Sequence, residues 1–300
     1  MDKFNSESLI ELVERFPTEQ SCREYLAGIK WSKGYKCRKC GHDRYQLRHN
    51  TSRCCNRCKT IESPTANTMF HRLRFGLKAA FMIIFEMGSS TKGMSASQIS
   101  RRYGISRFTA HFFMHKVRSV MKSSKSQKVS DSVVIDEFAL GGKEAGKPGR
   151  SYDTKKEKAV MLIKLTEEKK VKRAYINKID DFSSASIMSL FEDYVDMATA
   201  DITTDKWCSY QSILKKGYKI KQFLSDKDRV FKEIHTMIPQ FKSTIRAIYS
   251  CTRKEQSQKY FDEYCFRVNS SAFKSSILHK LTERMALAQP QTWKQIMISA

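Results

Sequence analysis

The sequence lacks any uninterrupted apolar run close to the roughly 18 residues that a membrane-spanning helix requires. Its longest apolar segment, Ala79–Phe85, suits a buried helix at most. The N-terminus begins with Asp2, Lys3 and Asn5, so the basic cap and apolar run of a signal peptide are also missing. These absences argue against an integral membrane or secreted protein. We expect a globular protein of the bacterial cytoplasm, with the nucleus as the alternative if the source is eukaryotic.

Acidic residues are scarce relative to basic ones. The chain has 55 Lys and Arg against 31 Asp and Glu, which gives a net charge of +24. Residues 1–130 hold 25 of the basic and 9 of the acidic residues and therefore carry +16 of this charge. A basic excess gathered in one part of a chain indicates a polyanion partner, most often nucleic acid. A basic surface that serves only solubility is the alternative.

The sequence also lacks the pattern of a disulfide-rich protein. Nine cysteines are spread over a long chain, and only four of them form Cys-x-x-Cys pairs. The remaining five are Cys22, Cys54, Cys208, Cys251 and Cys265. This distribution favours a reducing compartment and a metal site.

The four paired cysteines predict a zinc ribbon over residues 32–64. Cys37 and Cys40 are separated from Cys55 and Cys58 by fourteen residues, and Gly41 suits the tight turn after the first pair. Two such pairs can close a tetrahedral zinc shell with no open position, so we expect structural Zn²⁺. A redox pair or accidental spacing is the alternative. Cys54 is left out because its spacing to Cys58 is one residue too long.

Residues 65–121 predict a helical region that ends in a helix-turn-helix. An apolar segment up to Met87 indicates a buried helix closed by Gly88, and Gly104 supplies the later turn. Ser95 or Ser97 can cap the first helix of the motif and Ser106 the second. In that geometry the start of the second helix faces the DNA major groove. The expected DNA contacts are Arg101, Arg102, Arg107, Thr109 and His111. The alternative is a helical hairpin that only packs.

Three further segments complete the organisation. Residues 1–31 predict a short helical lead, residues 122–131 a linker rich in Ser and Lys, and residues 271–300 a helical tail. The expected role of the lead is packing against the next module or contact with a partner, and that of the tail is packing.

Residues 132–270 predict a mixed α/β domain with a ribonuclease H-like order of elements. Three strands come first, and helix and strand then alternate. The expected strands are 133–140, 159–165, 171–176, 202–204 and 218–223, with helices at 184–197 and 210–216. Asp136 and Asp205 each follow a β-branched apolar run, so their carboxylates can meet at one edge of the sheet.

Three ordered motifs in this region resemble a known family. They are Ile135-Asp136-Glu137 with Gly141-Gly142-Lys143, Thr204-Asp205-Lys206-Trp207 with Tyr210, and Phe261-Asp262-Glu263-Tyr264-Cys265-Phe266-Arg267-Val268-Asn269. Together they resemble the ISXO2-like transposase domain of the IS1595 group. The zinc ribbon and helix-turn-helix ahead of them also match that family's layout, so the resemblance covers nearly the whole chain.

The resemblance implies a DDE-type transposase with a two-metal site that holds Mg²⁺ or Mn²⁺. Asp136 and Asp205 match the family's first two acids. The third position usually holds Glu or Asn, sometimes His, with a Lys a few residues on. Here the best match is His235 with Lys242, and Glu233 is the competing ligand. Pro239 between His235 and Lys242 is expected to kink or start the helix that carries them.

Two neighbouring features receive lesser roles. Glu137 follows Asp136 in the strand, so we expect it to point to the opposite face of the sheet. A basic loop between the first two strands is interpreted as a DNA-contacting flap. Its residues are Lys147, Arg150, Lys155, Lys156 and Lys158.

The leading hypothesis is a transposase that binds terminal inverted repeats of double-stranded DNA, cleaves at the element ends and joins the 3′-hydroxyls to target DNA. A homo-oligomer is expected by analogy, because such enzymes pair two ends. Two alternatives remain open: an inactive, domesticated DNA-binding protein, and a zinc-ribbon nuclease that cuts without joining.

Overall fold

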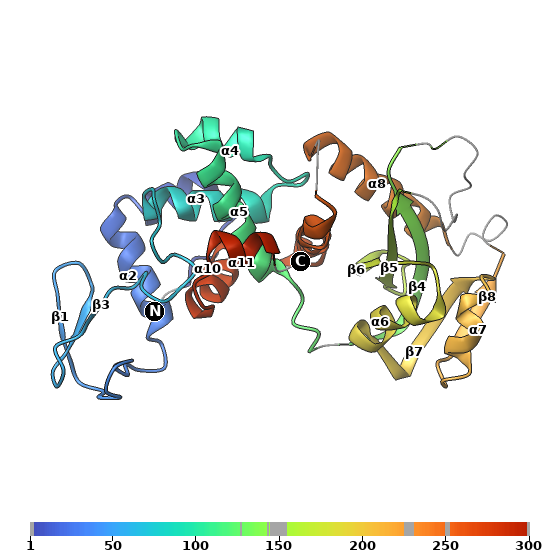
Figure 1. Ribbon diagram of the computed structural model, residues 1–300, viewed down its shortest axis with the longest axis horizontal. Coiled ribbons are helices and arrows are strands. Elements are labelled where there is room, and N and C mark those ends of the chain that lie inside the picture. The colour runs from blue at the N-terminus through green and yellow to red at the C-terminus, as the bar shows by residue number, and fades with distance from the viewer. Residues whose placement is uncertain are drawn as a thin grey trace. The chain divides into compact units, whose positions relative to one another are not determined.

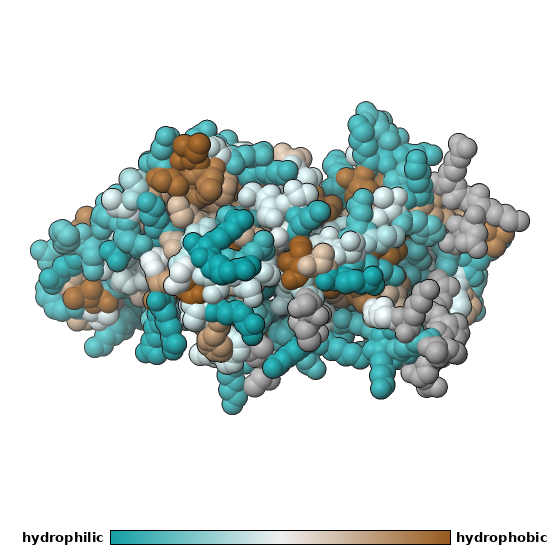
Figure 2. Space-filling model, turned by 90° about the horizontal axis from the view of Figure 1, so that it is seen from above, coloured by the Kyte–Doolittle hydropathy of each residue, from teal (hydrophilic) through white to brown (hydrophobic). Residues whose placement is uncertain are grey.

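The computed structural model describes residues 3–126, 128–142, 144, 155–224, 231–249 and 253–298, and the chain divides into two compact units. Residues 1–121 together with 270–299 form the helical unit, and residues 122–269 form the sheet unit. Figure 1 labels most of their helices and strands, and Figure 2 shows that hydrophilic side chains cover most of the visible surface. Among the described helices, none combines the length and the apolar character needed to cross a bilayer.

The helical unit joins the two ends of the chain in one core. Its elements are α1 (Leu9–Arg15), α2 (Glu19–Lys30), β1 (Tyr45–Leu47), β2 (Arg53–Cys55), β3 (Ile61–Glu62), α3 (Leu77–Ser89), α4 (Ala96–Tyr103), α5 (Arg107–Met121), η3 (Ser271–Ser276), α10 (Ile277–Leu287) and α11 (Trp293–Ile298). The tail helix α10 packs against α2, α3 and α5. Its His279 Nδ1 lies 2.7 Å from the hydroxyl oxygen of Tyr25, a residue 254 positions earlier in the chain.

The helix predicted to close at Gly88 instead includes this glycine. Helix α3 continues to Ser89, and α10 crosses it there. A Cβ atom on residue 88 would lie 2.1 Å from Ile277 Cγ2, well inside van der Waals contact. Gly88 therefore allows close helix packing rather than helix termination.

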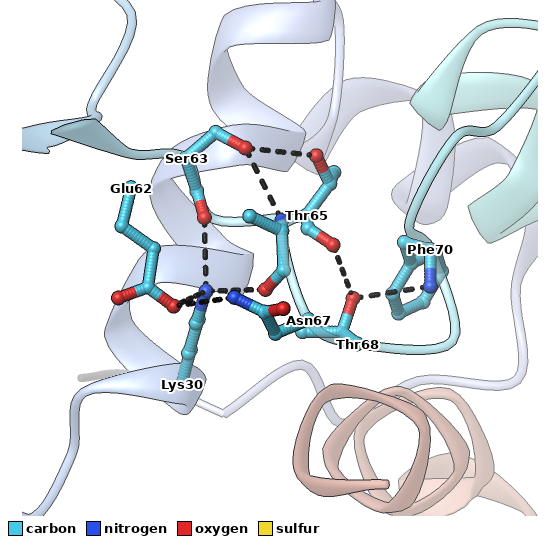
Figure 3. A network of polar contacts seen from close by, with 8 residues as sticks. Lys30, Glu62, Ser63, Thr65, Asn67, Thr68 and Phe70 are labelled. Carbon is cyan, nitrogen blue, oxygen red and sulfur yellow. Dashed lines mark hydrogen bonds and ion pairs between the residues drawn. The ribbon is translucent and has the colours of Figure 1, made fainter. Parts of the chain in front are cut away.

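Buried Lys30 binds the start of the segment that runs from the small sheet to α3 (Figure 3). Lys30 Nζ forms an ion pair with Glu62 Oε1 at 2.8 Å and donates hydrogen bonds to the carbonyl oxygens of Ser63 at 2.9 Å and Ala66 at 2.6 Å. The Lys30 and Glu62 side chains are only 10% and 9% exposed. Burial lowers the pKa of Lys30, while the bond to Glu62 opposes this effect.

We expect Lys30→Met to destabilise the helical unit by about 3 kcal/mol, because it leaves the buried Glu62 carboxylate without its cation and removes a donor from two backbone carbonyls. Urea unfolding of the full chain, followed by circular dichroism, measures the change. Lys33→Met, at an exposed position of the same segment, is the control and should change little. Equal stabilities of the two variants would contradict this role of Lys30.

The sheet unit is built on a mixed sheet with the strand order β6-β5-β4-β7-β8. Its elements are β4 (Val129–Leu140), β5 (Glu157–Leu165), β6 (Val171–Ile179), α6 (Ser184–Tyr194), β7 (Val195–Asp205), α7 (Ser209–Leu214), β8 (Ile220–Phe223), α8 (Lys232–Ile248), η2 (Lys254–Gln256) and α9 (Ser257–Asn269). Strands β4, β5 and β6 pair antiparallel, whereas β7 pairs parallel with β4 and with β8. This confirms the predicted ribonuclease H-like fold.

Both faces of the sheet are covered, which explains the nearly continuous apolar runs of β4 and β5. Val133 and Ile135 belong to a core that includes residues of α6 and α7, whereas Val134 and Phe138 belong to a core that includes residues of α8 and α9. Successive side chains of a strand point to opposite faces, so a strand that is covered on both sides is apolar at every position.

Several element boundaries differ from the sequence prediction. Strand β4 begins at Val129, inside the predicted linker. Helix α6 ends at Tyr194 rather than residue 197, and β7 takes over at Val195. The sequence predicts this strand only from residue 202 because its end, Ile202-Thr203-Thr204, is a continuous β-branched run. The first half of β7 mixes apolar and polar residues and gains its conformation from pairing with β4, a contact that local pattern does not reveal.

Helix α9 closes the β6 edge of the sheet through side-chain amides. Asn269 Oδ1 accepts a hydrogen bond from the Ala174 backbone N–H at 2.7 Å, and its Nδ2 donates to the Ala174 carbonyl at 2.9 Å. Gln258 Oε1 likewise accepts a hydrogen bond from the Lys178 backbone N–H at 2.8 Å, and its Nε2 donates to the Ile176 carbonyl at 2.9 Å. These bonds satisfy an edge strand that would otherwise expose unpaired backbone groups. The motif at 261–269 is therefore structural in this unit.

The buried carboxyl group of Asp262, in the same helix, is expected to make the free energy of unfolding depend on pH. Burial raises the pKa of Asp262 from 3.8 to about 6. A carboxyl group whose pKa is raised in the folded state stabilises the fold while it is protonated. This stabilisation is complete below the pKa of the unfolded state, about 3.8, and is lost as the pH rises above about 6. We expect Asp262→Asn, which can still accept the hydrogen bond of Gln258 Nε2, to stabilise the protein by up to about 3 kcal/mol at pH 8 and not at about pH 4. Urea unfolding at both pH values tests this; an equal gain at both would contradict it, and exposed Glu168→Gln is the control.

Candidate active site and metal sites

The parallel pairing of β4 with β7 brings Asp136 and Asp205 together. Val134 pairs with Thr203 in this register, and each aspartate lies two residues beyond its strand's paired residue. Strand β7 ends at Asp205, while β4 continues to Leu140. The two carboxylates therefore lie side by side where the β7 backbone leaves the sheet.

Glu137 joins these two aspartates, which the sequence reasoning did not anticipate. One carboxylate oxygen from each of Asp136, Glu137 and Asp205 lies within 4.8 Å of the others. The three residues are 9%, 6% and 8% exposed. Adjacent strand residues do point to opposite faces, but at the edge where β7 ends both side chains can reach the same point. The direct adjacency of the two acids was the available signal.

This carboxylate group fits a hard divalent cation. Mg²⁺ prefers oxygen ligands at about 2.0–2.1 Å in octahedral geometry, so its ligand oxygens lie about 3 to 4 Å apart. The spacing within the group approaches this range. Three carboxylates that are almost fully buried repel one another unless a cation lies between them.

The sequence around Asp205 holds its side chain in place. The Trp207 backbone N–H donates to Asp205 Oδ1 at 3.0 Å, and Gln222 Nε2 donates to the Asp205 carbonyl at 3.1 Å. Tyr210, fully buried on α7, lies next to the group. Burial first, and then the charges of Glu137, Asp136 and Asp205, raise the pKa of Tyr210 well above its ordinary value. The phenol therefore stays neutral beside the acids.

Of the two candidates for the third ligand, the structure places His235 at the site. Its Nε2 atom lies 3.3 Å from Asp136 Oδ2, and its ring stacks on Phe231 at 5.6 Å. Neither candidate residue belongs to the group of three carboxylates. Glu233 precedes His235 by two residues, which is more than half a helical turn, so its side chain leaves α8 on another side. Helix α8 begins at Lys232, so of the two expectations for Pro239, to kink or to start the helix, the second is wrong: the proline lies inside the helix.

His235 and Lys242 line one cavity of about 540 Å³ beside the carboxylates, together with Lys156. Two helical turns separate His235 from Lys242, which places them on the same face of α8. Lys242 Nζ lies 5.3 Å from the centre of the Phe138 ring, and burial lowers its pKa. The cavity is thus acidic at one wall and basic at others.

Only part of the predicted basic flap can be placed. Lys147 and Arg150 lie outside the described residues. Lys156 lines the cavity, whereas Lys158 is buried and donates to the Asp180 carbonyl at 3.3 Å. Lys155 is exposed.

The four predicted zinc ligands meet in the helical unit. The Sγ atoms of Cys37, Cys40, Cys55 and Cys58 lie within 4.8 Å of one another. The Cys37–Cys58 and Cys40–Cys55 pairs are 3.5 and 3.6 Å apart, close to the roughly 3.8 Å that tetrahedral Zn–S bonds of about 2.3 Å require. Hydrogen bonding to Thr60 lowers the pKa of Cys58 to about 6, which favours the thiolate that zinc binds.

The tight turn predicted after the first cysteine pair is present. Gly41 has φ +72° directly after the first cysteine pair. Cys54 points elsewhere, with its Sγ 3.7 Å from the Lys59 carbonyl oxygen, so it is not part of the cluster. The four cysteines are consistent with a zinc ribbon.

The helix-turn-helix forms as its caps predict. Ser95 and Gln98 make a reciprocal capping box, Gly104 ends α4 in the left-handed conformation at φ +62°, and Ser106 Oγ accepts from the Thr109 N–H at 3.1 Å. The five predicted DNA contacts differ in environment. Arg101 and Arg107 are exposed, while Arg102 forms an ion pair with Glu86 of α3.

Two of these residues lie against the tail. His111 Nε2 is 3.2 Å from His115 Nε2, and the His111 ring lies 6.0 Å from the ring of Trp293 in α11. Thr109 lines a second cavity that Trp293 also lines. Sequence reasoning missed this packing because the tail shows no local sign of where it docks.

The fold and the buried carboxylates define the sheet unit as a ribonuclease H-like domain with a candidate metal site. Residues 128–269 match the family described as the ISXO2-like transposase domain. This part of the chain is a DDE transposase domain, and such domains are polynucleotidyl transferases. No curated protein sequence matches the chain.

The solved structures similar to this chain include the cryo-EM structure of the simian T-cell lymphotropic virus intasome in complex with PP2A regulatory subunit B56 gamma. The sequence identity is 10% and the TM-score 0.32. The match covers 61% of this chain and 65% of the viral-complex chain, so it spans less than two thirds of the latter's length.

Proposed function

We propose that this protein is a DNA transposase that cleaves phosphodiester bonds at the ends of its element and joins the freed 3′-hydroxyls to target DNA. The observation that carries the proposal is the group of Asp136, Glu137 and Asp205 beside the cavity that contains His235 and Lys242, within a transposase-family domain. Acidic residues that served only to keep the surface soluble would be exposed to solvent, whereas all three of these are less than one tenth exposed.

The carboxylates and His235 are the residues that would hold the metal. Bound divalent ions, about 3.5–4 Å apart in two-metal sites, activate the attacking oxygen and stabilise the leaving one. A carboxylate oxygen of Asp136 lies within 4.8 Å of those of Glu137 and Asp205, and its Oδ2 atom lies 3.3 Å from His235 Nε2, so Asp136 would hold metal together with either. Imidazole suits Mn²⁺ better than Mg²⁺ in relative terms, which supports Mn²⁺ as an effective cofactor.

Lys242 and Lys156 would hold the DNA backbone in the cavity. Both cations line the same space as the acids, and a phosphate that approaches the carboxylates needs positive charge near it. The Phe138 ring below Lys242 fixes the ammonium group near the cavity.

The helical unit would bring the element ends to this site. Residues 32–64 are proposed as a zinc ribbon and residues 65–121 as a helical DNA-binding region, and this part of the chain carries most of the basic excess. Arg101 and Arg107, both exposed, are the proposed contacts to the terminal inverted repeats. Pairing of two ends would require a homo-oligomer.

Incubation of the purified protein with a DNA duplex that carries the element's end tests the proposal. With Mg²⁺ or Mn²⁺ we expect a nick at the end of the repeat that leaves a 3′-hydroxyl, and with chelator no nick. Nicking without subsequent joining would identify a nuclease. Sequence-specific binding without nicking in either metal would identify an inactive DNA-binding protein.

A further inference from the structure

A second cavity, of about 460 Å³, lies in the helical unit and has no part in the proposed metal chemistry. It is formed by the segment 71–75, the start and middle of α5, and residues 290–293 ahead of and at the start of α11. The chain thus brings a tail segment onto the predicted recognition helix and encloses a space there.

Aromatic rings form the walls of this cavity. The Trp293 and Phe108 ring centres are 4.4 Å apart at 38°, and Phe75 adds a third ring to the lining. Phe108 is 54% exposed, so part of its ring is open to a ligand. Exposed aromatic faces of this kind are the surfaces on which unpaired nucleobases stack.

One of the residues that line the cavity carries a buried polar atom. The Oε1 atom of Gln291 is buried and, among the residues that the structure describes, has no hydrogen-bond partner. Gln291 lines the cavity together with the aromatic residues. A buried acceptor without a donor costs about 1–3 kcal/mol, and a ligand with an N–H group would remove that cost. Nucleobases carry such donors at the edge of a flat aromatic ring.

Positive charge borders the same space. Arg72 and Arg74 line the cavity and are exposed to solvent, and Arg72 has a backbone φ of +53°. A non-glycine residue in this region of φ is held there by its surroundings, which fixes the direction of the segment between the two arginines. Guanidinium groups at a cavity mouth suit the phosphate attached to a base inside it.

We propose that this cavity binds a single unpaired nucleobase of the DNA on which the protein acts, stacked against the exposed ring of Phe108 beside Trp293, hydrogen-bonded to Gln291, with its phosphate held by Arg72 and Arg74. The inference rests on DNA being the substrate. It differs from groove reading by the helix-turn-helix, because a base enters such a cavity only when it has left its pair and its stack.

The test compares two single-stranded probes that share phosphates and differ in bases: a short oligodeoxyadenylate and an abasic strand of equal length. Fluorescence anisotropy in one buffer gives both affinities, since phosphate contacts depend on salt. We expect the full-length wild type to bind oligodeoxyadenylate about 5- to 100-fold more tightly than the abasic strand, as stacking of one base implies.

Two variants assign this preference to the cavity. Phe108→Ala and Gln291→Leu should each reduce the ratio of the two affinities by at least about 5-fold while leaving the affinity for the abasic strand unchanged. Phe273→Ala, which removes a 67% exposed ring elsewhere in the helical unit, is the matched control and should keep the wild-type ratio. Circular dichroism and zinc content verify that the variants are folded.

Equal affinity of the wild type for both probes, or an unchanged ratio in both variants, would overturn the inference. Self-association of the wild type that Phe108→Ala abolishes, with equal affinity for both probes, would assign the cavity to a second copy of the chain instead. The result for the cavity can be told apart from the result for the proposed transposase activity. Base preference without cleavage contradicts the transposase proposal alone, and cleavage without base preference contradicts the cavity proposal alone.

Discussion

Asp136→Asn and Asp205→Asn are each expected to reduce DNA cleavage by about 10³-fold or more while leaving DNA binding intact. Both residues are less than one tenth exposed, and their carboxylate oxygens lie within 4.8 Å of each other and of Glu137. An amide keeps the shape of the side chain but loses the charge that attracts a divalent ion. Loss of several kcal/mol of transition-state stabilisation by the metal corresponds to such a factor. Single-turnover cleavage of an end-labelled duplex measures the rate.

Asp201→Asn is the matched control for these variants. Asp201 lies in the same strand as Asp205, is paired with Lys221 at 2.7 Å, and has a side chain that is 55% exposed. The same chemical change there should leave the cleavage rate within about twofold of the wild type, as expected of a surface ion pair. Activity that survives Asp136→Asn and Asp205→Asn would remove the basis for a metal site at these residues.

The second large effect concerns the cysteine cluster. Elemental analysis of the wild type should give about one zinc per chain, and Cys37→Ser combined with Cys55→Ser should abolish zinc binding. Structural zinc contributes about 10–16 kcal/mol to the folding of small modules, far more than a core of the size built around Trp31 and Tyr35 supplies. We therefore expect the double variant to lose the ordered structure of residues 32–64 and to bind the element's end much more weakly.

Cys54→Ser provides the comparison for the double variant. Cys54 is buried and adjacent to Cys55, but its thiol lies outside the cluster, so this variant should keep its zinc and its DNA affinity. Zinc retained by the double variant, or lost from Cys54→Ser, would refute the assignment of the four ligands. Heteronuclear NMR or limited proteolysis reports whether the disorder is confined to the ribbon.

The sequence predicts those parts of this molecule whose cause is local. Two cysteine pairs at fixed spacing, a cap at Ser95 and a turn at Gly104 each act within a few residues: the four thiols meet, Ser95 caps α4 and Gly104 ends it. Asp136 and Asp205 were found because each stands at the end of an apolar run, and parallel pairing of these runs then brings the acids together.

The features that were missed depend on contacts between distant segments. Glu137 reaches the aspartates only because β7 ends beside it, and the first half of β7 is a strand because β4 pairs with it. Trp293 meets Phe108 across 185 positions of sequence, and Gly88 is helical because Ile277 packs on it. Neither contact leaves a periodic or compositional trace near the residues concerned.

The central claim, that the buried acids of the sheet unit serve DNA strand transfer, is tested most directly by a joining assay. A labelled duplex that carries the element's end with a free 3′-hydroxyl is incubated with the full-length protein and a supercoiled plasmid. We predict that the label becomes covalently attached to the plasmid with Mn²⁺ or Mg²⁺, and that neither chelator-treated protein nor Asp205→Asn produces the joined product. A folded, zinc-containing protein that binds the labelled end and yields no joined product in either metal would contradict the claim.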